Sequence, residues 1–246
     1  CLCCLYSWCR LVQIYTASEN RLALQELLPE AIISCYDSYD DSQLSHLLDW
    51  ADVVCIGCGL GMGQISEKIL KNVLKNVSCP CVIDADGLNL LSRNIELLNQ
   101  CCAPVILTPH MKEMSRLTGW SIDTIMEDRF QALDQIIKQS GPDTKSSIIC
   151  VLKDSRTVVA QTNRQRFVNL AGNNSMAKGG SGDVLAGTIA GLLAQHMAPF
   201  EATTVGVFLH ACGGDEAKKS KGSYSVLARD LIQGMADAMK NAKECR

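Results

Sequence analysis

Asn173-Asn174-Ser175-Met176-Ala177-Lys178-Gly179-Gly180-Ser181-Gly182-Asp183 leads directly into an apolar run over residues 184–194. The three glycines remove Cβ atoms where a backbone must turn sharply or approach a ligand closely. A helix over the apolar run would point its unsatisfied N–H groups at that space, which makes an anion site. Alanines and glycines are interleaved with larger apolar residues in the run, so we expect a helix buried against close neighbours.

Asp183 falls in the first turn of this predicted helix, where the helix dipole stabilises its charged form. A carboxylate beside an anion site favours phosphoryl transfer. The alternative is structural: Ser181 would cap the helix, Asp183 would compensate the dipole and the glycines would form an ordinary turn. Capping requires fewer glycines than this stretch supplies. Other glycine motifs are excluded by spelling, because no G-x-x-x-x-G-K-[ST] string occurs and residues 179–183 do not match G-x-S-x-G.

The composition fits one α/β domain with a sizeable core. The chain has 246 residues, 47% of them hydrophobic and 20% charged, and a net charge of -3. No basic stripe and no apolar run of about 20 residues occur, so we expect neither a nucleic-acid partner nor a membrane partner. Fourteen cysteines in mostly apolar settings indicate a reducing, cytoplasmic location. Cys55 and Cys58 form a C-x-x-C, as do Cys1 and Cys4, but no second pair follows at zinc spacing, and we predict no metal site.

Apolar patterns predict strands that alternate with helices along the whole chain. This order favours a mostly parallel sheet with helices on both faces. No linker or repeat interrupts it, which indicates a single domain over residues 1–246. We expect strands at 11–16, 52–57, 81–91, 105–108, 147–153, 157–160 and 166–170, and helices at 1–10 (the end of one), 18–28, 43–50, 64–76, 122–139, 184–194, 202–218 and 226–242.

A glycine-rich loop, Gly57-Cys58-Gly59-Leu60-Gly61, follows one predicted strand and precedes a helix. It lacks the third glycine of the G-x-G-x-x-G dinucleotide fingerprint. We interpret it as a loop that lets a ligand approach the backbone, and a tight turn is the alternative.

Polar residues also follow two other predicted strands. Asp84 and Asp86 lie where open α/β sheets bind ligands, although Asp86 could cap a turn while Asp84 faces a lysine. Pro109 leaves His110 at the start of a helix, where its ring could bind substrate or simply cap the helix. The other histidines, at positions 46, 196 and 210, are expected to be structural and without partners.

Residues 172–187 resemble the anion-hole and catalytic-base motif of the ribokinase-like superfamily, and most closely that of the ADP-dependent NAD(P)H-hydrate dehydratases. The similarity extends over nearly all of the chain from about Leu11. Other matching strings are residues 57–61 (Gly-Pro-Gly-Leu-Gly in the family), 84–89 (Asp-Ala-Asp-Ala-Leu-Asn), 108–117 (Thr-Pro-His-x-x-Glu-x-x-Arg-Leu) and 153–157 (Lys-Gly-x-x-Thr). Cys58 replaces the family's proline, and Asp154 replaces its glycine.

The resemblance implies a ribokinase-like three-layer α/β/α sandwich that dehydrates hydrated NADH or NADPH, (S)-NADHX or (S)-NADPHX. ADP would break down to AMP and phosphate, with Asp183 as the catalytic base. His110 favours the ADP-using branch over the ATP-using one. Mg²⁺ would bridge the phosphates, and the enzyme would be a homotetramer. The family's first strand and its glycine loop would precede Cys1.

The resemblance also assigns residues to the two sides of the site. The substrate side would comprise Gly59, Gly61, Asp86, Asn89, His110, Glu113 and Asp183. The nucleotide side would comprise Lys153, Asp154, Ser155, Arg156, Thr157, Gly179, Gly180, Ser181 and Gly182.

Two other functions remain open from the sequence. A ribokinase-like kinase for a small alcohol, such as a vitamin precursor, would share Gly-Ser-Gly-Asp, but it would not need the strings at 57–61 and 108–110 together. A nucleotide-binding protein without turnover is the second alternative.

Overall fold

The computed structural model describes residues 9–138, 147–162 and 165–244. The expectations for residues 1–8 and for the end of the helix at 122–139 therefore lie outside the described residues. Within the described ranges no helix combines the length and apolar character that crossing a bilayer demands.

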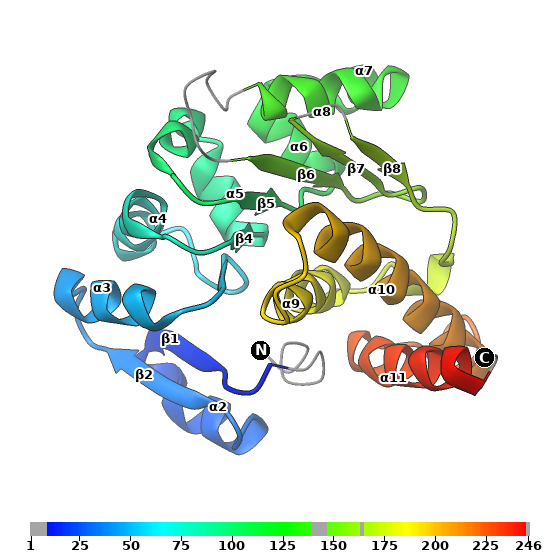
Figure 1. The fold of residues 1–246 in the computed structure, drawn as a ribbon, viewed down its shortest axis with the longest axis horizontal. Helices are drawn as coiled ribbons and strands as arrows, with labels where there is room; N and C mark the ends of the chain where they lie inside the picture. Colours follow the sequence, from blue (N-terminus) through cyan, green and yellow to red (C-terminus); the bar gives the residue numbers. More distant parts are fainter. Residues whose placement is uncertain (1–8, 139–146, 163–164, 245–246) are drawn as a thin grey trace.

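The central sheet contains six strands in the order β3-β4-β5-β6-β7-β8. The first four strands run parallel to one another. Strand β7 is antiparallel to β6, and β8 is antiparallel to β7 (Figure 1). The bounds are β3 Val54–Ile56, β4 Cys81–Ile83, β5 Val105–Leu107, β6 Ile148–Leu152, β7 Val158–Gln161 and β8 Arg166–Val168. In the parallel part, Ile56 pairs with Ile83 and Ile83 with Leu107, so the ends of these strands meet at one edge.

Helices cover both faces of this sheet, as the alternation of its side chains requires. Ile83 and Leu107 belong to the hydrophobic core beneath α3 to α8, whereas Val82 and Ile106 pack on the other face with α9 and α10. These bounds are α3 Asp41–Trp50, α4 Gln64–Asn76, α5 Ala85–Leu91, α6 Met111–Thr118, α7 Ile122–Glu127, α8 Arg129–Ile137, α9 Ser181–Leu193, α10 Pro199–Lys221 and α11 Ala228–Glu244. The expected three-layer arrangement with a mostly parallel sheet is confirmed.

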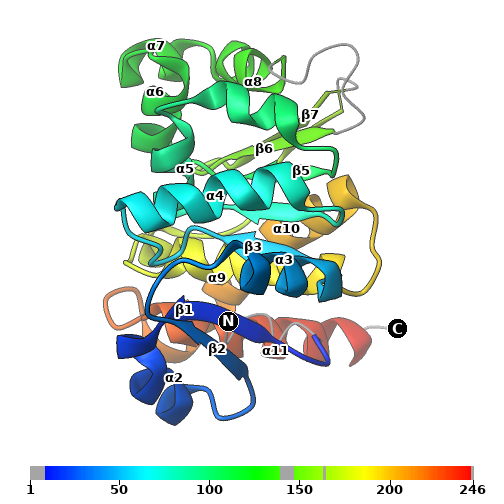
Figure 2. The ribbon, with the colours of Figure 1, turned by 90° about the vertical axis from the view of Figure 1, so that its left-hand side faces the viewer.

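A second, two-stranded parallel sheet is formed by β1 (Gln13–Ala17) and β2 (Ile32–Tyr36), with α2 (Arg21–Leu27) between them in the chain. It lies at the opposite end of the molecule from α7 and α8 (Figure 2). Ile14 packs with the α9 side of the core and Tyr15 with the α4 side. The sequence analysis predicted β1 and the helix after it but missed β2, because Ile32 to Tyr36 mixes apolar and polar residues without a clear period.

Two predicted elements are divided in the structure. The strand expected at 81–91 ends at Ile83, and α5 begins at Ala85, because the apolar residues after position 84 recur at helical spacing. The helix expected at 122–139 breaks at Asp128, whose backbone leaves the helical region and whose carboxylate accepts the Gln131 N–H. Asp128 therefore caps a second helix instead of continuing the first.

Two helices on the outer side pack closely because both carry a glycine at their crossing. A Cβ on Gly234 of α11 would lie 2.1 Å from the Gly213 carbonyl oxygen of α10. A Cβ on Gly213 would lie 2.5 Å from Met235 Cγ. The helices α9, α10 and α11 thus form a compact layer that carries residues 172–183 at its edge.

Gly234→Ala should lower the free energy of unfolding by about 1 to 3 kcal/mol, because the new methyl group overpacks the crossing with Gly213. The sign of the stability change tests the packing, because Gly→Ala at a helical position with free space raises the free energy of unfolding by about 1 kcal/mol. Urea denaturation measures it, and Gln233→Ala, at an exposed neighbouring position of α11, serves as the control. A stabilised Gly234→Ala protein would contradict this packing.

Candidate active site

The glycine stretch forms the beginning of α9 with its N-terminus open. Gly180 is the residue before the helix, in the left-handed conformation (φ 87°), and no side chain caps the helix. Ser181 is the first helical residue and is buried, so the structural alternative with Ser181 as the cap is wrong. Asp183 lies exposed in the first turn. The N-terminus of α9 is therefore available to an anion.

Gly182 lies close to two charged side chains. A Cβ at this position would stand 3.1 Å from Lys153 Nζ and 3.4 Å from Asp84 Oδ2. The first turn of α9 thus rests directly on a lysine from the end of β6 and an aspartate from the end of β4. An added Cβ would crowd the end of the lysine side chain, which would have to shift by a few tenths of an ångström.

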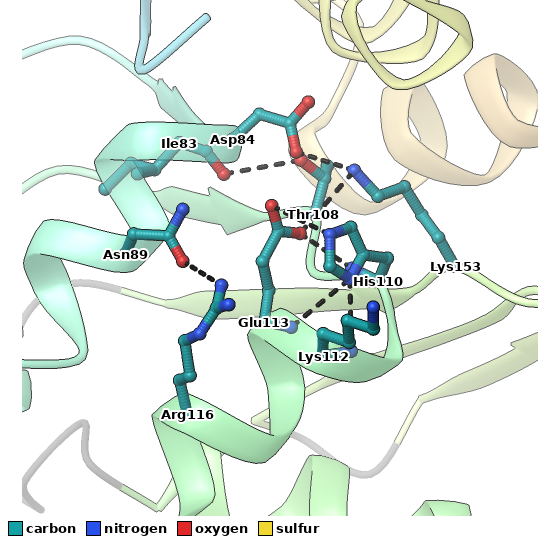
Figure 3. A network of polar contacts seen from close by, with 9 residues as sticks. All are labelled: Ile83, Asp84, Asn89, Thr108, His110, Lys112, Glu113, Arg116 and Lys153. Carbon is teal, nitrogen blue, oxygen red and sulfur yellow. Dashed lines mark hydrogen bonds and ion pairs between the residues drawn. The ribbon is translucent and has the colours of Figure 1, made fainter. Parts of the chain in front are cut away.

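Lys153 and Asp84 form a buried ion pair at this point (Figure 3). Lys153 Nζ donates to Asp84 Oδ1 at 2.7 Å, and the Asp84 side chain is only 2% exposed. Glu113 Oε2 lies 3.9 Å from the same ammonium group. Lys153 was assigned to the nucleotide side, and in the structure its ammonium group lies between the start of α9 and the acids of β4 and α6.

Asp84 is a site residue that the sequence analysis did not assign. One carboxylate oxygen each from Asp84 and Asp183 and the sulfur of Cys58 lie within 4.8 Å of one another. The signal that could have identified it was present, since Asp84 follows a buried strand at the carboxyl end of the sheet. The alternative that Asp84 faces a lysine describes its contact with Lys153 correctly.

The loop after β3 is held against α5. Gly61 N–H donates to Asp86 Oδ2 at 2.8 Å, which brings together two residues assigned to the substrate side. Gly57, Gly59 and Gly61 all have positive φ, and a Cβ on Gly57 would stand 1.8 Å from the Asp84 carbonyl oxygen. The glycine at position 57 is therefore required by a backbone contact, while Gly59 has no neighbour within 4 Å of its Cβ position.

His110 and Glu113 form a reciprocal cap at the start of α6 (Figure 3). His110 Nδ1 accepts from the Lys112 and Glu113 N–H groups, and Glu113 Oε2 accepts from the His110 N–H. Burial lowers the pKa of His110, and nearby Lys153 lowers it further, so the ring is neutral near pH 7 with its proton on Nε2. Burial raises the pKa of Glu113, although Lys153 opposes the shift. The imidazole caps the helix, its side chain is half exposed, and its Nε2 lies 3.4 Å from Glu113 Oε1.

Asn89 is connected to the same helix. Its Oδ1 accepts from Arg116 Nη1 at 2.6 Å, across the contact between α5 and α6 (Figure 3). Arg116 lies on α6 two turns after the cap. This bond fixes Asn89 beside the His110 and Glu113 pair without filling the edge of the sheet.

The β6–β7 turn carries the residues assigned to the nucleotide side. Asp154 Oδ2 accepts from Arg129 Nη2 at 2.6 Å, so the negative charge that replaces the family's glycine is paired. Arg156 Nη1 donates to the Leu170 carbonyl oxygen, and Thr157 Oγ1 donates to the Asp154 carbonyl oxygen. Ser155 is exposed and Thr157 half-buried. Arg129 is a partner that no sequence spacing could have indicated.

A pocket of about 380 Å³ adjoins the other side of the glycine stretch. It is lined by Asn174, Ser175, Ala177, Lys178, Lys218, Ser223 and Tyr224. Two of its lining residues are lysines, and its walls come from the loop before α9 and from the segment between α10 and α11. A phosphate-bearing ligand bound at α9 could extend into it.

Two residues of α10, Asp215 and His210, form hydrogen bonds with the stretch from Gly172 to Ser181. Asp215 accepts from the Gly172 N–H and from Asn173 Nδ2. His210 Nε2 lies 3.0 Å from the Ser181 carbonyl oxygen and 3.3 Å from its hydroxyl. The expectation that His210 lacks a partner is wrong, and its position on a helix that packs across α9 is the reason.

Known proteins resemble this chain in sequence. The sequence model of the NAD(P)H-hydrate dehydratase family matches residues 1–236 of this chain. This chain belongs to that family. A bifunctional NAD(P)H-hydrate repair enzyme Nnr from Moorella thermoacetica is 37% identical over 78% of this chain and 35% of its own length. An ADP-dependent (S)-NAD(P)H-hydrate dehydratase from Neisseria meningitidis is 35% identical over 88% of this chain and 73% of its own. The chain thus spans about a third of the length of the bifunctional relative.

Solved structures of the family share the fold. The ADP/ATP-dependent NAD(P)H-hydrate dehydratase of Bacillus subtilis, co-crystallised with ATP/Mg²⁺ and soaked with CoA, superposes with a TM-score of 0.81 at 26% identity, covering 98% of this chain and 84% of that one. A ribokinase-like superfamily protein from Enterococcus faecalis gives 0.78 at 33% identity, covering 97% and 80%. The ribokinase-like fold is confirmed.

Lys153→Met should lower the free energy of unfolding by about 3 to 5 kcal/mol, because it leaves the Asp84 carboxylate buried without its partner. The double variant Lys153→Met with Asp84→Asn should recover part of that loss. Lys71→Met, which removes an exposed pair with Glu67, should change stability by less than about 1 kcal/mol. Equal losses in the two single variants, measured by urea denaturation, would contradict a special role for the buried pair.

His210 should make the protein less stable in mild acid. Burial lowers the pKa of His210 from 6.5 to about 4. Between these two pH values His210 is protonated in the unfolded chain but neutral in the folded chain. The free energy of unfolding should therefore fall between pH 6.5 and 4, by on the order of 3 kcal/mol from this group. His210→Gln should flatten the pH dependence of unfolding over this window, whereas His46→Gln, at an exposed position, should leave it unchanged. Identical slopes in both variants would exclude His210 as the source.

Proposed function

We propose that this chain catalyses the dehydration of (S)-NADHX and (S)-NADPHX to NADH and NADPH, with ADP converted to AMP and phosphate. One observation carries the proposal: Asp183 lies at the uncapped start of α9, within 4.8 Å of Asp84, in a chain of the NAD(P)H-hydrate dehydratase family. An anion site and a carboxylate base at one place are what phosphoryl transfer to an alcohol requires.

Asp183 is the base. It accepts the proton of the ring hydroxyl as the hydroxyl oxygen attacks the terminal phosphorus of ADP, and the bond from that phosphorus to the bridging oxygen breaks to release AMP. The carbon–oxygen bond of the new ester then breaks, phosphate leaves, and a proton leaves the adjacent ring carbon as the double bond is restored. Phosphate departs far more readily than hydroxide, which is why the nucleotide is consumed.

The amides from Gly179 to Gly182 stabilise the transferring phosphoryl group. No side chain caps α9, so none has to be displaced first, although the Ser181 N–H already donates to the Lys178 carbonyl oxygen. Lys153 adds positive charge beside Gly182, and Asp84 fixes the direction of its side chain. Fixed donors and charges of this kind act where charge develops in the transition state.

The hydrated nicotinamide binds between the loop at Gly59 and Gly61, the start of α5 and the start of α6. The neutral His110 ring offers its Nε2 proton to the substrate, while Glu113 holds the ring in place through the cap. Asp86 keeps the loop closed through Gly61, and Asn89 lies on the same helix, α5. These contacts support the assigned substrate side.

The nucleotide binds on the other side of α9, with its phosphates at the glycines. The Lys153 ammonium group beside Gly182 and the pocket beside Lys178 and Lys218 support this placement. ATP could replace ADP, as the name of the Bacillus subtilis relative states for that protein. Mg²⁺, when bound with the nucleotide, neutralises phosphate charge; Asp84 and Asp183 are the oxygen donors beside the glycines that suit it.

The same proposal includes the setting in which the enzyme works. We place it in the reducing cytoplasm, because Cys81, Cys101 and Cys150 are buried thiols of the core. We also propose a homotetramer; Val205 and Phe208, exposed one turn apart on α10, are suitable contacts for neighbouring copies.

Asp183→Asn should reduce turnover by at least 100-fold while it preserves the fold, because the amide cannot accept the hydroxyl proton. The assay mixes hydrated NADH with ADP and follows recovery of reduced-nicotinamide absorbance together with free phosphate. Asp237→Asn, at an exposed position of α11, is the matched control and should keep wild-type activity. Accumulation of a phosphorylated alcohol instead of free phosphate would indicate a kinase, and ADP binding without any turnover in the wild type would indicate a binding protein.

A further inference from the structure

Cys58 brings a thiol into the centre of the site. Its sulfur and one carboxylate oxygen each from Asp84 and Asp183 lie within 4.8 Å of one another. The three side chains come from three separate segments, namely the loop after β3, the end of β4 and the first turn of α9. Such convergence requires the whole fold and is independent of the spacing of the C-x-x-C pair.

Asp84 presents an oxygen that the ion pair leaves unused. Its Oδ1 accepts from Lys153, whereas no hydrogen bond among the residues that the structure describes uses Oδ2. Oδ2 lies on the side of Gly182, 3.4 Å from the position of a Cβ there. The side chain as a whole is 2% exposed, and Oδ2 is the oxygen that the ion pair leaves for a ligand.

We propose that Cys58, Asp84 and Asp183 together bind a borderline-soft divalent cation of the Zn²⁺ class. One thiolate and two carboxylates leave a fourth position open, as in zinc sites with three protein ligands. With bonds of about 2.3 Å to sulfur and about 2.0 Å to oxygen, a tetrahedral ion separates its ligand atoms by about 3.5 Å. The three ligand atoms lie within 4.8 Å of one another, so metal binding requires side-chain rotations that bring them to this separation.

The surrounding charges favour a cation. Three carboxylates, those of Asp84, Asp183 and the nearby Glu113, face two cations, Lys153 and the more distant Arg116, and His110 is neutral near pH 7. The thiolate selects Zn²⁺ over Mg²⁺, because magnesium prefers oxygen ligands and gains little from sulfur. Binding releases the thiol proton, so the affinity rises with pH.

A metal at this place would occupy the carboxylate of Asp183. This consequence, unlike metal binding itself, rests on the proposed function, in which Asp183 is the base. Zn²⁺ would then inhibit dehydration reversibly, and a chelator would restore activity. A family member with proline at the position of Cys58 lacks the sulfur ligand.

Metal binding is tested without turnover. Reduced protein freed of metal is titrated with Zn²⁺ against a chromophoric chelator, and with Co²⁺ to record the thiolate-to-cobalt charge-transfer absorption. Cys58→Ser and Cys58→Ala should each lose one tight equivalent, with affinity at least tenfold weaker, and should lose that part of the Co²⁺ absorption. Cys102→Ser, another exposed cysteine, should match the wild type. Equal Zn²⁺ affinity and equal Co²⁺ spectra in all four proteins would overturn the proposal.

Asp183→Asn provides a second readout that keeps the thiol. It should also weaken Zn²⁺ at least tenfold, although the Co²⁺–thiolate absorption remains at high metal concentration. Unchanged affinity in this variant would remove Asp183 from the ligand set and overturn the three-residue site. In activity assays, the Zn²⁺ concentration for half inhibition should rise at least tenfold in Cys58→Ser relative to Cys102→Ser. An inactive wild type would reject the proposed function and leave the binding result intact.

Discussion

The buried pair between Lys153 and Asp84 is the interaction on which the site depends. It joins the ends of β4 and β6, which lie two strands apart in the sheet, and it lies directly under the first turn of α9. A carboxylate that is 2% exposed is tolerated only with a charged partner. The pair therefore fixes both the sheet edge and the direction in which the lysine points.

Glycines make this arrangement possible by removing side chains where backbones and charges meet. Gly182 gives room to the ion pair, and Gly57 allows the loop after β3 to touch the Asp84 backbone. Gly213 and Gly234 let α10 and α11 approach each other behind α9. At Gly57, Gly213 and Gly234 backbone atoms already fill the space, so an added methyl group has nowhere to go, whereas at Gly182 it would crowd the end of the Lys153 side chain.

Close packing places residues with two different roles, binding of the substrate and binding of phosphate, at one edge of the central sheet. In the proposed function, the capped His110 ring and the Asp86 loop bind the substrate, and the open α9 terminus binds the phosphates. Asp183 lies between them and is the only one of these groups that we assign to proton transfer. Cys58 places a thiol beside two carboxylates, and this is the arrangement on which the proposed metal site rests.

Much of the protein was determined by its sequence alone. Apolar periodicity predicted most strands and helices, and the glycine stretch predicted an open helix terminus with Asp183 in its first turn, because these signals are local. Only the tertiary structure decided that Asp84 pairs with Lys153, that Arg129 neutralises Asp154, that His210 supports Ser181 and that Cys58 joins two carboxylates. These partners are 25 to 69 positions apart where a bond joins them, and no periodic pattern encodes such contacts. Parallel strands bring their ends together in space whatever their separation in the chain, which is why the chemistry of the site emerges only with the fold.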